Sequence, residues 1–248
     1  MNVLSKVLNF ITFQKMKKIL VTGAARGIGY ELCKQSLEQN HEVLATYRSK
    51  STADALFDLE QNSQNLRLIE MDVNSDKSVK LAFQSIAEQF EHLDTLYNNA
   101  GILDWATLNE VSSEVFREIY ETNVIGAFRV SKTSLSLMRK SNDPLIVNLS
   151  SRLGSISLRG HSQLGGAIAY QCSKAALNML TTQMAIDYKE LGVRVISISP
   201  GWVRTDMGGK EAKYEVQESV RLFTSQIEKL TPSESGIFIG EDGEVIPW

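Results

Sequence analysis

The 248 residues include 43% hydrophobic and 22% charged side chains and carry a formal net charge of -3, which predicts a globular protein with a sizeable core and excludes a disordered chain. Lysines and arginines are scattered along the sequence, so no basic stripe indicates a nucleic-acid partner. The two cysteines and three histidines show neither a disulfide framework nor the spacing of metal ligands, which favours a metal-free protein in a reducing, cytoplasmic setting.

The segment 1–15 is expected to be an extension ahead of a single domain over residues 16–248. The first eighteen residues contain four lysines and no acid, which also fits a targeting peptide. The apolar run 7–13 is short for the core of a signal peptide and much shorter than the roughly 20 residues of a membrane span. Two alternatives remain, a targeting segment or an extension before a start at Met16, and no membrane association is expected.

Short apolar, β-branched runs predict strands, and the longer segments between them have the apolar spacing of helices. In chain order, the expected elements are strand 19–22, helix 28–37, strands 43–46 and 66–71, helix 79–90, strand 93–97, helix 115–138, strand 145–149, helix 169–188, strand 193–198 and a last short strand 237–239.

This alternation requires crossover connections, which produce a parallel sheet covered on both faces. No Pro-rich linker, low-complexity stretch or repeat interrupts the sequence. The predicted fold class is therefore α/β, with a single-domain, Rossmann-type, doubly wound parallel β-sheet and helices on both of its faces. Ligands of such sheets bind at the carboxyl ends of the strands, near the point where the strand order reverses.

The first expected strand runs directly into a glycine-rich loop, Thr22-Gly23-Ala24-Ala25-Arg26-Gly27-Ile28-Gly29, which opens a helix. Glycines at such a turn let backbone N–H groups and the amino end of the helix approach a pyrophosphate. Three glycines alone would indicate only a loop. Their position between a strand and a helix favours dinucleotide binding.

The TGxxxGxG spacing of this loop resembles that of the short-chain dehydrogenase/reductase family. Further motifs follow in the family's order, namely Asp72, Asn98-Asn99-Ala100-Gly101, Asn123, Ser151, Tyr170-x-x-x-Lys174 and Pro200-Gly201. The segment 200–209 and the ending 246–248 resemble the C-factor/sniffer-like branch of carbonyl reductases. This resemblance covers residues 16–248 and implies an oxidoreductase that moves a hydride between a nicotinamide cofactor and a carbonyl or alcohol carbon.

The residues around the second expected strand favour NADP(H) as that cofactor. A carboxylate about 20 residues beyond the glycine loop would hydrogen-bond an adenosine 2′-hydroxyl, but no acid occurs between Glu42 and Asp54. Arg48, together with Arg26 in the loop, can instead bind a 2′-phosphate. The alternative is that both are solvated surface arginines.

Tyr170 and Lys174 stand four residues apart on an expected helix and therefore share one face. An ammonium group close to a phenol favours the phenolate, so Lys174 is expected to lower the pKa of Tyr170 and make it a usable general acid or base. The family resemblance implies that Ser151 binds the reacting oxygen, with Ser150 as its rival, and that Tyr170 exchanges the proton. It also implies that Lys174 holds the nicotinamide ribose and that Asn123 anchors a water.

The same resemblance assigns further residues to the cofactor, each with a structural alternative. Asp72 and Val73 would border the adenine, although Asp72 can equally cap the next helix. Val203 and Thr205 would meet the carboxamide. The remaining cofactor candidates are Gly23, Arg26, Gly27, Ile28 and Gly29 in the loop, and Asn99, Ala100 and Gly101 on the adenosine side.

The substrate mouth is expected where the loop 152–169 and the segment 202–230 converge at the strand ends. Leu153, Trp202 and Met207 are the candidate wall residues, and they favour a neutral small-molecule carbonyl or alcohol. Arg204 is the alternative, as a ligand for an acidic substrate. The long loop 152–169 can also be a plain surface insertion.

Two other expectations concern mobility and reactivity. Gly208 and Gly209 are expected to let the segment 202–230 move over the substrate. Cys172 is interpreted as a small buried side chain in preference to a reactive thiol.

Two functional hypotheses follow. The first is an NADP(H)-dependent carbonyl reductase or alcohol dehydrogenase, and the second is an NADP(H)-binding signalling or redox-sensing protein that does not depend on turnover. Because a pure sensor would not need Tyr170 and Lys174 together, the sequence favours the enzyme. In the family, helices equivalent to 115–138 and 169–188 pair across a two-fold axis, so a homodimer or homotetramer is expected.

Overall fold

A parallel seven-stranded sheet lies at the centre of the computed structural model, which describes residues 15–159 and 165–248. The strand order is β3-β2-β1-β4-β5-β6-β7, and it reverses between β1 and β4. The strands are β1 (Lys18–Val21), β2 (Glu42–Tyr47), β3 (Leu66–Glu70), β4 (Thr95–Asn98), β5 (Leu145–Leu149), β6 (Arg194–Ile198) and β7 (Phe238–Ile239). The expected extension 1–15 lies, except for its last residue, outside the described part.

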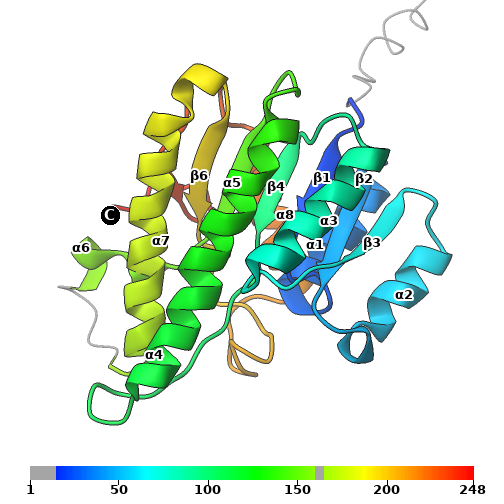
Figure 1. Ribbon diagram of the computed structural model, residues 1–248. Coiled ribbons are helices and arrows are strands. Elements are labelled where there is room, and N and C mark those ends of the chain that lie inside the picture. The colour runs from blue at the N-terminus through cyan, green and yellow to red at the C-terminus, as the bar shows by residue number, and fades with distance from the viewer. Residues whose placement is uncertain (1–14, 160–164) are drawn as a thin grey trace, which may run out of the picture.

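Helices cover both faces of this sheet. Figure 1 shows α3, α5 and α7 across the front, whereas α1 and α8 lie behind the strands. The α-helices are α1 (Gly27–Glu38), α2 (Asp54–Gln61), α3 (Asp76–Gln89), α4 (Ser113–Tyr120), α5 (Ala127–Met138), α6 (Ile156–Arg159), α7 (Ile168–Asp187) and α8 (Val216–Ile227), and the other helical turns are η2 (Lys50–Thr52), η3 (Glu121–Gly126), η4 (Arg152–Gly154) and η5 (Lys189–Leu191).

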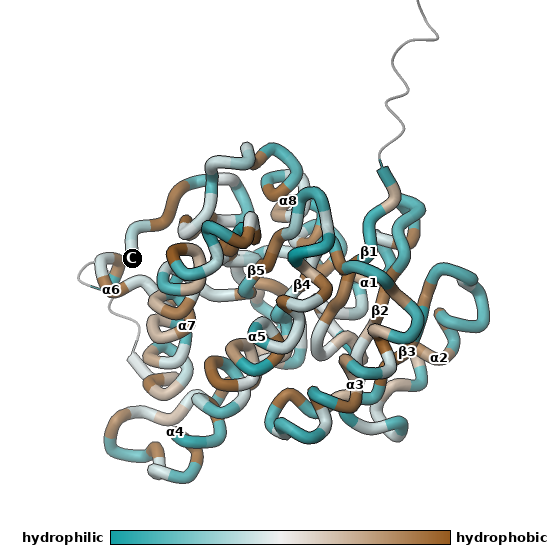
Figure 2. Tube along the Cα trace, turned by 45° about the horizontal axis from the view of Figure 1, so that its top comes forward, coloured by the Kyte–Doolittle hydropathy of each residue, from teal (hydrophilic) through white to brown (hydrophobic). Residues whose placement is uncertain are grey.

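Strands β1 to β6 each contribute to two separate cores, because successive side chains of a strand point to opposite faces. In β1, Ile19 and Val21 belong to the core that contains Leu32 of α1 and Phe223 of α8, whereas Leu20 belongs to the core beneath α3 and α5. Figure 2 shows the strands as largely hydrophobic stretches between more hydrophilic helices and loops. These two cores confirm the predicted doubly wound fold.

The expected helix 115–138 is wrong in one respect, because it is interrupted. Between α4 and α5, the chain forms the π-helical turn η3, which contains Asn123. Such wide turns are often found at functional sites. At the end of η3, a Cβ on Gly126 would lie 3.0 Å from a methyl group of Val73. An apolar spacing that continues through the turn cannot reveal this change of helix type.

The other expected elements lie within three residues of the observed bounds. The periodicity did not predict α2 or α8. In α2, only Leu56 is buried, so its apolar pattern is weak. The segment 152–169, expected as a loop, contains η4, α6 and the first residues of α7.

Candidate active site

The loop between β1 and α1 depends on its glycines. Gly23 and Gly27 have φ angles of +63° and +57°, in a region that favours glycine. A Cβ on Gly23 would lie 2.9 Å from the Cα of Ala100, and a Cβ on Gly29 would lie 2.4 Å from the Asn99 amide. The loop therefore packs directly against the end of β4, where Asn99 and Ala100 follow the strand.

Hydrogen bonds hold these two strand ends together. The Thr22 hydroxyl oxygen accepts from the backbone N–H groups of Asn99 and Ala100, both at 3.0 Å. In return, the Asn99 side-chain amide donates to the carbonyl oxygens of Thr22 and Gly23, at 2.8 and 3.0 Å. The structure thus brings the predicted residues of the glycine loop and of the Asn-Asn-Ala-Gly motif into one rigid surface.

The amino end of α1 keeps its backbone N–H groups available. Its N-cap residue Arg26 makes no side-chain cap, and its first turn contains no acidic residue. Unsatisfied N–H groups at a helix amino end attract an anion. Ile28, in the same turn, packs against the core and anchors this end of the helix.

Beyond β3, Asp72 and Val73 occupy different environments. An Asp72 carboxylate oxygen accepts from the backbone N–H of Asn74 at 3.0 Å. Ser75, and not Asp72, caps α3, through a bond from the N–H of Ser78. Val73 is buried, and its carbonyl oxygen accepts from Arg129 of α5. The helix-capping alternative for Asp72 is therefore wrong.

The two arginines assigned to the 2′-phosphate both lie at the carboxyl edge of the sheet. Arg48 directly follows β2, the strand beside β1, and its side chain is exposed. It makes no ion pair with any residue in the described ranges. Arg26 pairs with Asp206 at 2.8 Å, and both side chains are about 80% exposed (80% and 81%). One of the two cationic groups is thus already matched by a carboxylate.

Tyr170 and Lys174 lie on the inner face of α7, where only 8% and 5% of their surfaces are exposed. The Lys174 ammonium donates to the carbonyl oxygen of Leu149, at the end of β5, at 2.7 Å. It lies 5.4 Å from the centroid of the Tyr170 ring. The helix therefore places the pair at the carboxyl edge of the sheet, as expected.

The structure distinguishes Ser151 from its rival Ser150. Ser150 is 3% exposed, and its hydroxyl donates to the side chain of Asn178 at 2.6 Å, away from Tyr170. Ser151 caps η4, where its hydroxyl oxygen accepts from the N–H of Leu153 at 3.1 Å, and its side chain also hydrogen-bonds that of Tyr170. Ser151 is thus the serine that faces the tyrosine.

Asn123 connects three parts of the site from the π-helical turn. Its side-chain oxygen accepts from the N–H of Ile102 at 2.8 Å, and its amide donates to the Ile102 carbonyl at 2.9 Å and to the Ser173 hydroxyl at 3.0 Å. Ser173 in turn donates to the carbonyl oxygen of Tyr170 at 2.7 Å. A Cβ on Gly101 would lie 3.3 Å from the Asn123 side-chain oxygen and 3.7 Å from the Lys174 ammonium. The candidate catalytic residues therefore meet in one place.

Burial dominates the ionisation of the tyrosine and the lysine. It raises the pKa of Tyr170 to about 12, although the hydrogen bond with Ser151 acts in the opposite direction. It also lowers the pKa of Lys174 to about 8. The expectation that Lys174 lowers the pKa of Tyr170 is therefore wrong in this structure, because loss of water disfavours the charged form of both groups.

The segment after β6 lies against the glycine loop. A Cβ on Gly27 would be 3.5 Å from the Thr205 methyl group, and Val203 is buried. Gly208 is required for close packing, because a Cβ there would be 2.0 Å from the Val203 carbonyl oxygen. The Arg204 guanidinium pairs with Glu215 and donates to the Ala212 carbonyl. The segment is therefore internally bonded in this structure.

The candidate wall residues for the substrate lie in two different surroundings. Trp202 is 55% and Met207 37% exposed, and the Trp202 indole N–H donates to the Gly208 carbonyl at 2.7 Å. Leu153 instead lines a cavity beside α6 and α7, with neither Trp202 nor Met207 among the described lining residues.

Sequence reasoning missed Arg152, which follows the candidate catalytic serine. Its guanidinium forms ion pairs with Asp242 at 3.1 Å and Glu244 at 2.9 Å, and it lies 3.7 Å from a buried oxygen of Glu241. These bonds fasten the turn after Ser151 to the segment beyond β7. The sequence does show several acidic residues near its end, but nothing in it connects them to Arg152.

Ser173 and Asp206 were missed for related reasons. Ser173 stands inside the Tyr-x-x-x-Lys motif, but the contact that matters is with η3. Asp206 is 180 residues from its partner Arg26.

In the part of the chain that the structure describes, no group of three or more His, Cys, Asp or Glu side chains is placed to hold a metal ion. Across residues 15–159 and 165–248, none of the helices has the length and apolar character needed to cross a membrane.

Comparison with known proteins agrees with this arrangement. The sequence matches the short chain dehydrogenase family over residues 17–215. The C-signal protein of Myxococcus xanthus is 36% identical over 157 residues, which cover 63% of this chain and 93% of that protein.

Two solved structures are similar over most of the chain. An NADPH-bound carbonyl reductase from chicken fatty liver has a TM-score of 0.90 and 34% identity and covers 94% of this chain and 99% of its own. The carbonyl reductase Sniffer of D. melanogaster has a TM-score of 0.88 and 32% identity, with coverage of 94% and 100%. These comparisons confirm the predicted fold class and the resemblance to that branch of carbonyl reductases.

Proposed function

This chain belongs to the short chain dehydrogenase family, and we propose that it is a carbonyl reductase that transfers a hydride between NADP(H) and the carbonyl or alcohol carbon of a small molecule. One observation carries the proposal. The buried Tyr170 side chain is hydrogen-bonded to that of Ser151 and lies beside the buried Lys174, at the same edge of the sheet as the glycine loop. The three groups needed to polarise and protonate a carbonyl oxygen are therefore together.

The glycine loop fits a pyrophosphate. The backbone at Gly23 and Gly29 leaves no room for a Cβ, because it packs against the residues that follow β4, and this packing holds the loop in place. The amino end of α1 adds N–H groups without a side-chain cap or an acidic neighbour. An anion can approach this end of the helix closely and gain from the helix dipole.

The remaining part of a dinucleotide would extend from this loop in two directions. Arg26 and Arg48 would bind an adenosine 2′-phosphate by charge-assisted hydrogen bonds, which supports NADP(H) over NAD(H). The other proposed contacts are Ile28 and Gly27 at the pyrophosphate, Asp72 and Val73 at the adenine, Asn99, Ala100 and Gly101 along the adenosine side, Tyr170 and Lys174 at the nicotinamide ribose, and Val203 and Thr205 at the carboxamide.

When bound, NADPH supplies the hydride, and the protein's own groups handle the oxygen and the proton. The Ser151 hydroxyl donates to the carbonyl oxygen and orients it. Because burial holds the pKa of Tyr170 at about 12, its hydroxyl stays protonated at neutral pH and is available as a general acid. After that transfer, the nearby Lys174 ammonium stabilises the phenolate. Asn123 holds α7 and the β4 end in register and would anchor a water that returns the proton.

A neutral substrate is favoured over an acidic one. Arg204, the candidate ligand for an acidic group, is already engaged by Glu215 and by the Ala212 carbonyl. Trp202 and Met207 present apolar surface on the segment after β6. We therefore propose a neutral aromatic or aliphatic carbonyl as the substrate class.

A panel of carbonyl compounds tests this proposal through the loss of NADPH absorbance. We expect faster turnover of neutral aromatic and aliphatic aldehydes or ketones than of matched keto acids, and higher affinity for NADPH than for NADH. Oxidation of NADPH by none of the panel would refute the carbonyl assignment. Tighter binding of NADH would refute the cofactor assignment by itself.

The sensor hypothesis is not favoured. The C-signal protein is similar to this chain in sequence, but the buried Tyr170, Lys174 and Asn123 form a complete proton-handling set that cofactor binding alone does not require. Burial of a lysine in particular is costly, which argues for a chemical use.

We also propose that two copies pair through α5 and α7. Large apolar side chains with exposures between 41% and 69% lie on these helices and on the turn before α5, namely Ile125 of η3, Phe128 of α5, and Met179 and Ile186 of α7. Burying them against a second copy would remove this surface from water. Light scattering at micromolar concentration should give a particle well above 27.6 kDa.

The proposed setting is cytoplasmic, with residues 16–248 as one domain behind an extension.

A further inference from the structure

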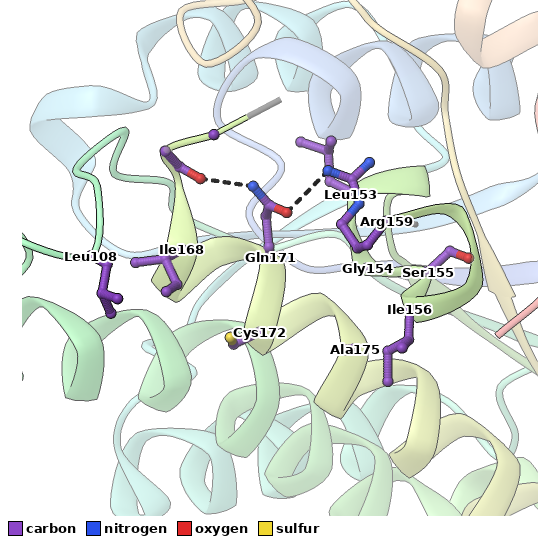
Figure 3. Close-up of a pocket in the computed structure, with 12 residues that line it drawn as sticks. Leu108, Leu153, Gly154, Ser155, Ile156, Arg159, Ile168, Gln171, Cys172 and Ala175 are labelled. Atoms are coloured by element: carbon purple, nitrogen blue, oxygen red, sulfur yellow. Dashed lines mark hydrogen bonds between the residues drawn. The ribbon is translucent and has the colours of Figure 1, made fainter. Parts of the chain in front are cut away.

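The turn that carries Ser151 is held on one side by α7. Ser151 caps η4, and its hydroxyl oxygen accepts from the Leu153 N–H at 3.1 Å. Gly154 packs directly on the helix, since a Cβ there would lie 2.7 Å from the backbone carbonyl carbon of Lys174. The Asn178 amide donates to the Gly154 carbonyl oxygen at 3.3 Å. Figure 3 shows Leu153 and Gly154 close to α7. Close packing thus fixes one side of the serine turn.

Arg152 holds the other side of the same turn. Its backbone N–H donates to the Ser199 hydroxyl at 3.3 Å, and its guanidinium lies over the backbone of Gly240, where a Cβ would collide with a terminal nitrogen. One terminal nitrogen pairs with Asp242 at 3.1 Å and the other with Glu244 at 2.9 Å. The Arg152 side chain is 31% exposed, so water screens these pairs less than it screens fully exposed ones.

Asp242 and Glu244 lie on a turn that is fixed to the end of β7. The N–H of Gly240 donates to the Glu244 carbonyl oxygen at 2.8 Å, and that of Gly243 donates to the Gly240 carbonyl oxygen at 3.0 Å. An Asp242 carboxylate oxygen also accepts from the Glu244 N–H at 3.1 Å. Because the turn is hydrogen-bonded within itself, it offers the Arg152 guanidinium a rigid pair of acceptors.

Glu241, in the same turn, connects Arg152 to the segment after β6. Its side chain is 6% exposed, and one carboxylate oxygen lies 3.7 Å from the guanidinium. This oxygen accepts no hydrogen bond within the described ranges. A Cβ on Gly201 would lie 3.0 Å from the Glu241 carboxyl carbon and 2.9 Å from the Tyr214 ring. Since a buried carboxylate needs a compensating cation, Arg152 joins the serine turn and the segment 201–215 at one point.

We propose that Arg152 is a positioning residue, which holds the Ser151 hydroxyl where it must meet the carbonyl oxygen of the substrate; this inference rests on the proposed reductase function. Three carboxylates surround the Arg152 guanidinium, so it is already matched and is not a ligand for an acidic substrate. Its effect passes through the neighbouring Ser151. A displacement of about 1 Å in a reacting group can reduce a rate by as much as about 100-fold.

Kinetics in two backgrounds separate this positioning role from a purely structural one. In the wild type, Arg152→Met should reduce kcat about tenfold and leave the Kd of NADPH within about twofold. In a Ser151→Ala background, the same substitution should change the residual kcat by less than about twofold, because no hydroxyl is left to position. An equal loss of kcat in both backgrounds would overturn the proposal.

Two further variants control for misfolding and for a general loss of stability. Arg152→Lys keeps a cation beside the buried Glu241, but one ammonium cannot replace two nitrogens that reach separate carboxylates. We expect it to fold as the wild type does and to recover only part of the rate. Arg194→Met removes an ion pair with Asp143 at the amino end of β6 and should leave kcat unchanged. Wild-type kcat in both Arg152 variants would contradict the positioning role.

Amide hydrogen exchange tests the same contacts without turnover. Arg152→Met should speed exchange at Leu153, whose N–H bonds the Ser151 hydroxyl, and in the turn 240–244, but not in β1. Unchanged exchange at Leu153 would remove the proposed role, and faster exchange across the whole sheet would indicate general destabilisation instead. If the panel of carbonyl compounds showed no turnover, the proposed reductase activity would fail, while exchange at Leu153 would still decide whether Arg152 holds the serine turn.

Discussion

The two ends of the proposed cofactor cleft differ in how far water reaches their charged groups. At the catalytic end, Tyr170 and Lys174 are 8% and 5% exposed. At the adenosine end, the paired side chains of Arg26 and Asp206 are 80% and 81% exposed. Buried ionisable groups have strongly shifted pKa values, and substitutions of them are poorly tolerated. Exposed charges are screened by water, so their interactions are weaker. Substitutions should therefore have large effects at the first end and small ones at the second.

The largest effect is expected from Tyr170→Phe, which removes only the phenolic hydroxyl. Loss of the general acid should reduce kcat by on the order of 10²- to 10⁴-fold, while NADPH affinity measured by fluorescence titration stays close to that of the wild type. Turnover that matches the wild type would show that the tyrosine is not the acid. A parallel loss of NADPH binding would instead indicate a structural role.

A pH-dependent change in stability is expected next, from Lys174→Met. The pKa of Lys174 is about 8 in the folded protein, against 10.5 for a free side chain. Between these values the unfolded chain binds more protons, so the stability from this group is lowest below pH 8 and rises with pH. The wild type should gain about 1–3 kcal/mol relative to the variant between pH 7 and pH 10.

Urea unfolding at several pH values measures this gain. Lys80→Met, at an exposed lysine of α3, is the control and should give a difference that does not change with pH. If the difference in unfolding free energy between the wild type and Lys174→Met also did not change with pH, the Lys174 ammonium would be better hydrated than its burial indicates. The catalytic and adenosine ends would then differ less in how far water reaches their charged groups.

A smaller effect is expected from Arg48→Ala, at the exposed end. The variant should bind NADPH about tenfold more weakly, which corresponds to roughly 1.4 kcal/mol for one charge-assisted hydrogen bond, and should bind NADH as the wild type does. Arg139→Ala, at an exposed arginine that follows α5, is the matched control. Equal losses for both cofactors would point to a local structural change and not to a 2′-phosphate contact.

The smallest effect is expected from Asp206→Asn, which frees Arg26 from its ion pair. NADPH affinity should increase by at most about fivefold, because exposed pairs contribute less than about 1 kcal/mol. The increase should disappear at high salt and in an Arg26→Ala background. Glu114→Gln removes a comparable exposed ion pair on α4 and should have no effect. A decrease in affinity would show that Asp206 orients Arg26 for the phosphate and does not compete with it.

The sequence by itself determined the sheet, the glycine loop and the spacing of the catalytic motif. Each of these depends on local patterns. Runs of β-branched residues predict strands, the glycines mark the turn after β1, and four residues of separation place Tyr170 and Lys174 on one face of a helix. The alternation of strands and helices was sufficient to predict the doubly wound fold, because few topologies satisfy it.

Only the tertiary structure decided the features that depend on distant or sterically selected neighbours. Ser150 and Ser151 are adjacent, yet one hydroxyl faces Asn178 and the other faces Tyr170. The pKa of Tyr170 is raised and not lowered, since its burial depends on how α7 packs on the sheet. Asp206 meets Arg26 across 180 residues. Local pattern specifies how a segment folds, but desolvation and pairing depend on what packs against it, which no single segment encodes.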